Sequence, residues 1–300
     1  IGTTTQINYT YDKAGNISKI EQGNLYVLYY YDNAGQLIRE NNKFLDKTIV
    51  YVYDKGGNIR ERQEFAYTEN VTLGTPITTI PYLYGNTTWT DLLTSYNGQT
   101  ITYDESGNPL TYRDGYTFEW EAGRQLKSLT KNTDELSFTY NENGLRTSKT
   151  VNDVTTYYTL DGDKITSQRT GSITDVFSYD ADGKVISMYS GGNIYYYVRN
   201  IQGDIIHILD EDGNRVVNYV YDSWGKIIST TGTLANTIGK SNPFRYRGYF
   251  YDNETGLYYL QSRYYDPEVG RFLNADDTVI LEIIEGEILG NNLFDYCYNN

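Results

Sequence analysis

The chain has 300 residues and is 39% hydrophobic, but 34 of its hydrophobic residues are Tyr, which leaves little Val, Leu and Ile for a solid core. Its net charge is −14, and its 25 Lys and Arg residues form no basic stripe, which argues against nucleic-acid binding. The single cysteine, Cys297, excludes an internal disulfide, and the longest apolar run is too short to span a membrane.

A six-residue phrase recurs along the chain: Tyr, Asp, two loose positions, Gly and usually Asn. A repeat of this density decides the architecture. Full copies also occur at residues 179–184 and 221–226, and degenerate copies begin at Tyr140 and Leu209. The first four copies contribute the structural residues Tyr11, Asp12, Gly15, Tyr31, Asp32, Gly35, Tyr53, Asp54, Gly57, Tyr103, Asp104 and Gly107.

Each copy of the phrase is typical of a strand end followed by a turn. The Tyr closes an extended run and packs against a cross-strand neighbour, and the Asp carboxylate accepts backbone amides of the turn. The Gly takes the left-handed conformation that a type I turn with a bulge requires. The sequence therefore predicts an all-β chain of antiparallel hairpins, with only residues 278–285 open to a helical interpretation. A sheet so poor in aliphatic residues is expected to be wet on much of both faces.

Two further parts of the sequence resemble one known family. Residues 89–98, 101–110 and 118–126 are similar to a repeat segment of the Rhs and YD-repeat proteins, whose repeat is the Tyr–Asp phrase itself. Residues 244–273 resemble the Rhs core-associated signature, which closes the repeat array in that family. The structural residues of this signature are Arg247, Gly248, Tyr251, Asp252, Gly256, Arg263, Tyr264, Tyr265, Asp266, Pro267, Gly270, Arg271 and Phe272.

The resemblance implies both a fold and a function. In Rhs proteins, toxin-complex C components and teneurins, such repeats spiral into a hollow β-shell, and in bacterial members the shell encloses a toxic C-terminal domain. Here it implies YD-repeat hairpins in residues 1–241 and a capping region in residues 242–300 of a partial shell. The toxic domain is expected beyond residue 300, as the enclosed partner. The protein is expected to be secreted or on the surface of a bacterium, in particular a Gram-positive one.

The resemblance also implies a self-cleaving site, similar to an aspartic protease, beside the signature. One family Asp follows the stretch found here at residues 270–273, which makes Asp276 the candidate and its neighbour Asp277 the second choice. The second family Asp lies in an Asp-Pro-x-Gly-Leu sequence, which does not occur before Asn300. Since the chemistry needs two carboxylates that share a proton, this chain alone is not expected to cleave itself. A solvated turn is the alternative interpretation of both residues.

Other interpretations stay open for the remaining polar and aromatic residues. The Tyr clusters at residues 29–31 and 195–197 are a candidate sugar platform, so the alternative function is a surface adhesion or glycan-binding module. His207 and Cys297 are expected to be structural, the first half-buried in a strand and the second packed. No cofactor or metal is expected. The arginines of the signature, Arg245, Arg247, Arg263 and Arg271, are expected either to bridge carboxylates between cap and shell or to be ordinary surface charges.

Overall fold

The computed structural model of this chain describes residues 6–276 and 292–300. The chain folds into two compact units. Unit 1 contains residues 103–274, and unit 2 contains residues 3–102 together with residues 275–300. Copies of the repeated phrase occur in both units, so the same turn chemistry organises each of them.

The described strands of unit 2 form one antiparallel sheet, in which each strand pairs with the next along the chain. Its strands are β1 (Asn8–Tyr11), β2 (Ile17–Gln22), β3 (Leu25–Tyr31), β4 (Leu37–Asn42), β5 (Lys47–Tyr53), β6 (Ile59–Ala66), β7 (Thr78–Leu83), β8 (Ser95–Tyr96) and β9 (Gln99–Thr100).

A second meander, also in chain order, makes up most of unit 1. Its described strands are β10 (Thr102–Tyr103), β11 (Pro109–Thr111), β12 (Thr117–Glu121), β13 (Gln125–Lys131), β14 (Asp134–Tyr140), β15 (Arg146–Val151), β16 (Val154–Asp161), β17 (Lys164–Thr170), β18 (Ile173–Tyr179), β19 (Val185–Ser190), β20 (Asn193–Arg199), β21 (Ile205–Leu209), β22 (Arg215–Tyr221) and β23 (Ile227–Thr231).

The signature residues of unit 1 form a separate small antiparallel sheet. The described helices of the chain are single turns. The small sheet contains β24 (Phe250–Asp252), β25 (Leu257–Leu260), β26 (Arg263–Asp266) and β27 (Arg271–Phe272), and the helical turns are η1 (Arg113–Gly115), α1 (Ile238–Ser241), η2 (Tyr246–Gly248) and η3 (Cys297–Asn299).

The all-β antiparallel prediction is confirmed, and the repeated phrase explains where strands end. In the pairs β1–β2, β3–β4 and β5–β6, the register shifts by one residue at the Tyr of the phrase, as a bulge requires. The helical alternative for residues 278–285 lies outside the described residues.

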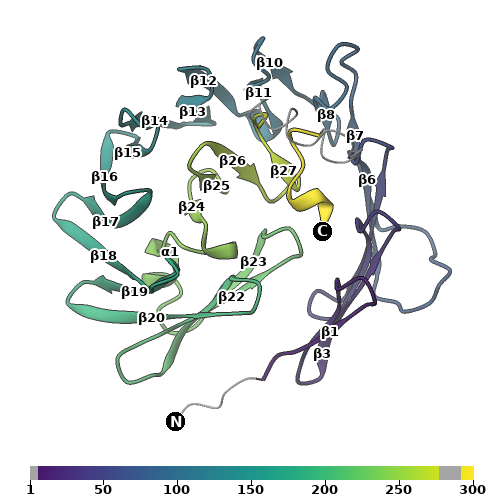
Figure 1. Cartoon of the computed structure of the whole chain (residues 1–300), viewed down its shortest axis with the longest axis horizontal. Coiled ribbons are helices and arrows are strands. Elements are labelled where there is room, and N and C mark those ends of the chain that lie inside the picture. The colour runs from purple at the N-terminus through teal and green to yellow at the C-terminus, as the bar shows by residue number, and fades with distance from the viewer. Residues whose placement is uncertain (1–5, 277–291) are drawn as a thin grey trace. The chain divides into compact units, whose positions relative to one another are not determined.

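The expectation of a sheet wet on both faces is wrong for unit 1. One face of its large sheet contacts residues 242–274, and we call it the inner face. Figure 1 shows β24, β25 and β26 inside the curve that β12–β20 describe. Inner-face side chains such as Leu126, Phe138, Met188 and Ile208 are buried, because the signature segment covers them. Although the large sheet has few aliphatic residues, its inner face is covered by the signature segment and not by water.

Candidate functional site

The turn of the repeated phrase is built around its Asp. In the first copy, Asp12 Oδ1 accepts the backbone N–H groups of Ala14 and Asn16, both at 2.9 Å. Gly15 donates to the carbonyl of Asp12 at 3.2 Å with a φ of 91°, in the left-handed region that favours glycine. The carboxylate therefore satisfies two donors that the turn would otherwise leave without a partner.

Sequence reasoning missed one copy of this turn. Asn200 Oδ1 accepts the N–H of Asp204 at 2.9 Å, and Gly203 donates to the carbonyl of Asn200 at 3.1 Å. The phrase is hidden here because Arg199 replaces Tyr and Asn200 replaces Asp. The available signal was the spacing between Asn200 and Gly203, since an Asn side chain can accept backbone amides as Asp does.

The Tyr of the phrase has a role that its strand position did not reveal. Its hydroxyl donates to a backbone carbonyl in the preceding repeat, on the first residue of the strand that follows the preceding turn. Tyr31 donates in this way to Ile17, the first residue of β2, at 2.9 Å. Tyr53 repeats this contact with Leu37 at 2.8 Å. Burial, with the charges of Asp12 and Glu40, raises the pKa of Tyr31 to about 12, so the hydroxyl remains a donor at neutral pH. These hydrogen bonds tie each repeat to its predecessor.

Aromatic rings join the signature segment to the inner face of unit 1. The ring centroids of Phe177 and Phe244 are 4.9 Å apart at an interplanar angle of 87°, an edge-to-face contact. Tyr158 meets Phe250 in the same way, with centroids 5.3 Å apart. Such pairs contribute about 0.5–1.5 kcal/mol each beyond area burial. The sheet and its cover are therefore joined by specific contacts.

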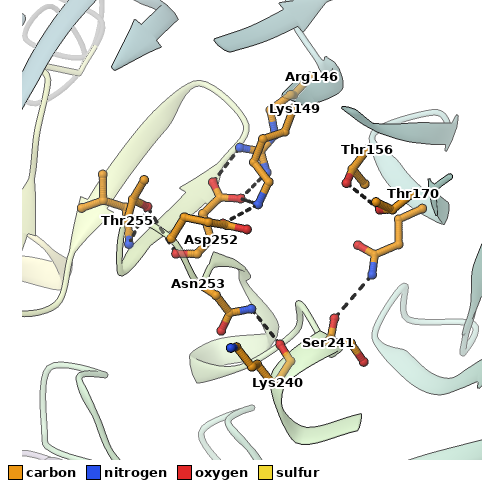
Figure 2. A network of polar contacts seen from close by, with 12 residues as sticks. Arg146, Lys149, Thr156, Thr170, Lys240, Ser241, Asp252, Asn253 and Thr255 are labelled. Atoms are coloured by element: carbon orange, nitrogen blue, oxygen red, sulfur yellow. Dashed lines mark hydrogen bonds and ion pairs between the residues drawn. The ribbon is translucent and has the colours of Figure 1, made fainter. Parts of the chain in front are cut away.

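A fully buried ion pair anchors the signature to β15. The guanidinium of Arg146 donates to both carboxylate oxygens of Asp252, at 2.7 and 3.2 Å, and neither side chain is exposed. Lys149 Nζ lies 3.0 Å from the same carboxylate and 2.7 Å from Glu254 (Figure 2). Burial alone would raise the pKa of Asp252, but Arg146 and Lys149 outweigh it and hold this pKa below its ordinary value. We call Arg146, Lys149 and Asp252 the central lock.

Aromatic rings surround the guanidinium of the central lock. Its Cζ atom lies 4.2 Å from the ring centroid of Tyr259, 5.1 Å from that of Phe250 and 5.2 Å from that of Tyr158. Desolvated cation–π contacts of this kind are worth about 2 kcal/mol or more. The buried charge is thus stabilised by a carboxylate and by rings from both layers.

A second buried pair lies nearer the start of the large sheet. Arg113 of η1 makes a bidentate contact with Asp266 of β26, from Nε at 2.7 Å and from Nη2 at 2.9 Å. Asp266 is fully buried and also accepts the N–H of Glu268 at 2.9 Å, inside the turn that contains Pro267. We call Arg113 and Asp266 the edge lock. It fixes the end of the signature as the central lock fixes its middle.

The two locks add bridging arginines that the sequence did not suggest, from outside the signature. Arg113 comes from the turn η1 and Arg146 from β15, both among the repeats, and both carboxylates come from the signature. For Arg247 the bridging alternative is confirmed, since its Nε lies 3.8 Å from the carboxylate of Asp204, in the turn before β21. Arg245 instead donates to the carbonyl of Asn242, at 2.9 Å. Arg113 and Arg146 were missed because nothing near them in sequence distinguishes them from surface charges.

The candidate catalytic residue lies in unit 2, in a segment that returns to the repeats. Asp276 is half-buried, and its backbone N–H donates to the carbonyl of Leu293 at 2.9 Å. Asp277 lies outside the described residues. Nearby, Asn292 Nδ2 donates to Asn58 Oδ1 at 2.9 Å, in the turn of the third repeat. The repeated turn thus also serves as a docking point for the terminal segment, residues 292–300.

His207 and Cys297 have structural surroundings of different kinds. His207 is half-buried in β21, as expected, and burial together with the charge of Arg215 lowers its pKa to about 4. Its imidazole is therefore neutral at pH 7. Cys297 is exposed, so the packed thiol is wrong. The turn η3 buries Asn299 instead, whose Nδ2 donates to the carbonyl of Gly57 at 2.8 Å.

The described residues contain no cluster of three or more His, Cys, Asp or Glu side chains that could hold a metal ion. The helices within these described residues are all too short and too polar to cross a membrane.

Comparison with known proteins gives matches of three kinds. Residues 163–300 match the Teneurin YD-shell family. Over 90% of its length, the chain is 33% identical to the tRNA3(Ser)-specific nuclease WapA of Bacillus spizizenii and 34% identical to the tRNA nuclease WapA of Bacillus subtilis, but it spans only 11% of each. It is also 27% identical over 90% of its length to the double-stranded DNA deaminase toxin A of Burkholderia cenocepacia, and spans 20% of that protein.

Solved structures share the fold at low sequence identity. The TcdB2-TccC3-Cdc42 crystal structure matches 99% of this chain with a TM-score of 0.78 and 18% identity, over 16% of its own chain. The Photorhabdus luminescens Tc holotoxin pore matches 98% of this chain, with a TM-score of 0.69 and 19% identity, also over 16% of its own chain. The YD-shell fold therefore accounts for both units.

Proposed function

Because this chain belongs to the Rhs/YD-repeat family and has the fold of the toxin-complex shells, we propose that it is the cap-bearing part of a shell that encloses a toxic domain encoded after residue 300. In this proposal residues 1–241 form the repeat wall and residues 242–300 form the capping region. The partner is the downstream domain of the same polypeptide. The protein acts outside the cell that makes it, secreted or on the surface, where a delivery machinery or a surface glycan is a further partner.

One observation carries the proposal: residues 242–274 are held against the inner face of a YD sheet by two buried ion pairs, the central lock and the edge lock. A signature segment held this firmly against the sheet is what a shell needs if it is to keep a domain enclosed. Two of the relatives are named as nucleases and one as a DNA deaminase toxin, activities that would damage a cell producing them unguarded. The relatives come from both Bacillus and Burkholderia, so they do not favour a Gram-positive source.

Protease protection in the full-length protein tests the enclosure. We expect the segment after residue 300 to survive native trypsin treatment for as long as the repeats remain folded, because the wall excludes the protease. The measurement is the lifetime of that segment by mass spectrometry, compared with the same segment added separately to this chain. Equal rates of digestion in the two samples would show that the shell does not enclose it.

The second candidate function is self-cleavage, and the half-buried position of Asp276 favours it over the solvated turn. In the full-length protein we expect Asp276→Asn to leave the precursor uncut, because the amide cannot share a proton with a second carboxylate. Gel analysis of the purified protein measures this. The control is Asp161→Asn, which changes an exposed carboxylate of β16 and should leave cleavage intact. Normal cleavage of the Asp276 variant would remove the assignment.

The sugar platform at the Tyr clusters has little surface to offer. On β20, Tyr195 and Tyr197 are buried and only Tyr196 of that cluster is exposed, at 45%. Tyr30 is the exposed member of the other cluster, at 42%. Strand alternation sends neighbouring side chains to opposite faces, so three consecutive tyrosines cannot form one platform.

A further inference from the structure

A cavity of about 420 Å³ lies in unit 1 between the inner face of β16–β18 and the segment that carries α1 and β24. Figure 2 shows part of its wall, with Thr156 and Thr170 on one side and Lys240 and Asn253 on another. Asn236 and Lys240 are exposed and mark its mouth, whereas Asp175 is buried. Its volume is that of a small-molecule site. The cavity is separate from Asp276, which belongs to unit 2.

The wall of this cavity contains a carboxylate with an unused acceptor. Asp175 is 5% exposed, and its Oδ2 accepts Nε2 of Gln168 at 2.9 Å. Its Oδ1 is buried and has no hydrogen-bond donor among the described residues. Buried acceptors are nearly always satisfied, and leaving one without a donor is unfavourable. Oδ1 of Asp175 therefore needs a hydrogen-bond donor, which a ligand in the cavity can supply.

The charges around the cavity balance. Lys149 is paired with Glu254 at 2.7 Å and with Asp252 at 3.0 Å, so its charge is neutralised within the protein. Among the described residues that leaves one cation at the mouth, Lys240, and one anion in the wall, Asp175. The site has no excess charge to attract an ion, and a ligand without net charge fits it best.

The lining of the cavity contains both aromatic rings and hydrogen-bonding groups. Tyr158, Phe250 and Tyr251 supply rings, and Asn236 at the mouth supplies an amide with both donors and an acceptor. Gln168 supplies its amide oxygen, because its Nε2 already donates to Asp175 and to the carbonyl of Ser241. A sugar ring has the complementary surface, because its C–H faces stack on aromatic rings and its hydroxyls both donate and accept. We propose that this cavity binds a neutral sugar, one of whose hydroxyls donates to Asp175. The site goes beyond the proposed enclosure and does not depend on it.

Saturation-transfer NMR on the whole chain tests the sugar site, with glucose, galactose and N-acetylglucosamine as separate probes. We expect at least one of them to show saturable transfer. Two variants should each weaken its binding about 5-fold or more, because each removes one hydrogen bond to the sugar. One is Asp175→Asn in the wall. The other is Asn236→Ala at the exposed mouth, where the change does not put folding at risk. Lys164→Ala is the matched control, because Lys164 lines a different cavity of about 390 Å³ and should leave binding unchanged.

Three results would overturn the proposal. The first is the absence of transfer to all three sugars in the folded chain. The second is transfer that Asn236→Ala and Asp175→Asn leave unchanged, since the sugar would then bind elsewhere. The third comes from free alanine, used as a zwitterionic probe: if alanine alone binds and Asp175→Asn abolishes its binding, the ligand is an amino acid and Asp175 receives an ammonium group.

Discussion

Asp252→Asn is expected to lower the free energy of unfolding of this chain by about 3–5 kcal/mol, because it leaves the buried Arg146 without its counter-charge. The amide of Asn keeps the shape of the side chain but not its charge. Lys149 retains Glu254, so the loss should centre on Arg146. Urea denaturation followed by circular dichroism measures the change.

The pH dependence of the same variant tests the cause. The pKa of Asp252 lies below its ordinary value of 3.8 in the folded chain, so its contribution is complete above the unfolded pKa and disappears as the pH falls through the folded one. The stability difference between wild type and variant should therefore be constant at about pH 5–7 and shrink below about pH 4.

An exposed ion pair provides the control for the central lock. Glu119 lies 3.6 Å from Lys127, with both side chains more than half exposed, and Glu119→Gln should change stability by less than about 1 kcal/mol. A loss that small in Asp252→Asn as well would mean that the buried pair does not hold the signature to the sheet.

Gly225→Ala is expected to destabilise the chain by about 2–5 kcal/mol, far more than the same change at an equivalent turn. Gly225 has a φ of 87°, and a Cβ added there would lie 2.5 Å from Cγ of Tyr246, a ring of the signature that is itself buried. The left-handed backbone accounts for about 1–2 kcal/mol and the collision with the ring for about 1–3 kcal/mol more.

Gly213→Ala separates these two contributions. Gly213 occupies the same position of a degenerate phrase with a φ of 79°, but nothing lies within 4 Å of an added Cβ. This variant should therefore lose only the backbone share, about 1–2 kcal/mol. Equal losses in the two variants, measured by urea denaturation, would show that the ring of Tyr246 gives way and that the cover does not pack tightly on this turn.

Much of the fold follows from local chemistry that the sequence displays openly. The turn of each phrase needs only an Asp, a Gly three positions after it, and the neighbouring backbone amides, as Asp12 and Gly15 show. Such contacts join residues at most four positions apart, so spacing alone predicts them. The copy at Asn200 was missed because a match by residue type depends on the Tyr and Asp of the phrase. Its turn has the geometry of the others, but Arg199 and Asn200 stand at those two positions.

The candidate sites were predictable only in part. The alignment of Asp276 with its family position rests on neighbouring residues, so the sequence could name it, but its burial depends on the distant terminal segment. The locks could not be named at all. Arg113 and Asp266 are separated by 153 positions, and Arg146 and Asp252 by 106, with no motif that links either pair.

By itself the sequence determined the all-β hairpin series, the turns and the family, because each depends on residues close together along the chain. Only the tertiary structure decided that the signature covers the inner face, that the anchoring arginines come from the repeats, and that a polar cavity remains beside Asp175. The physical reason is desolvation: a charge becomes a strong and specific contact only where two distant segments together exclude water from it.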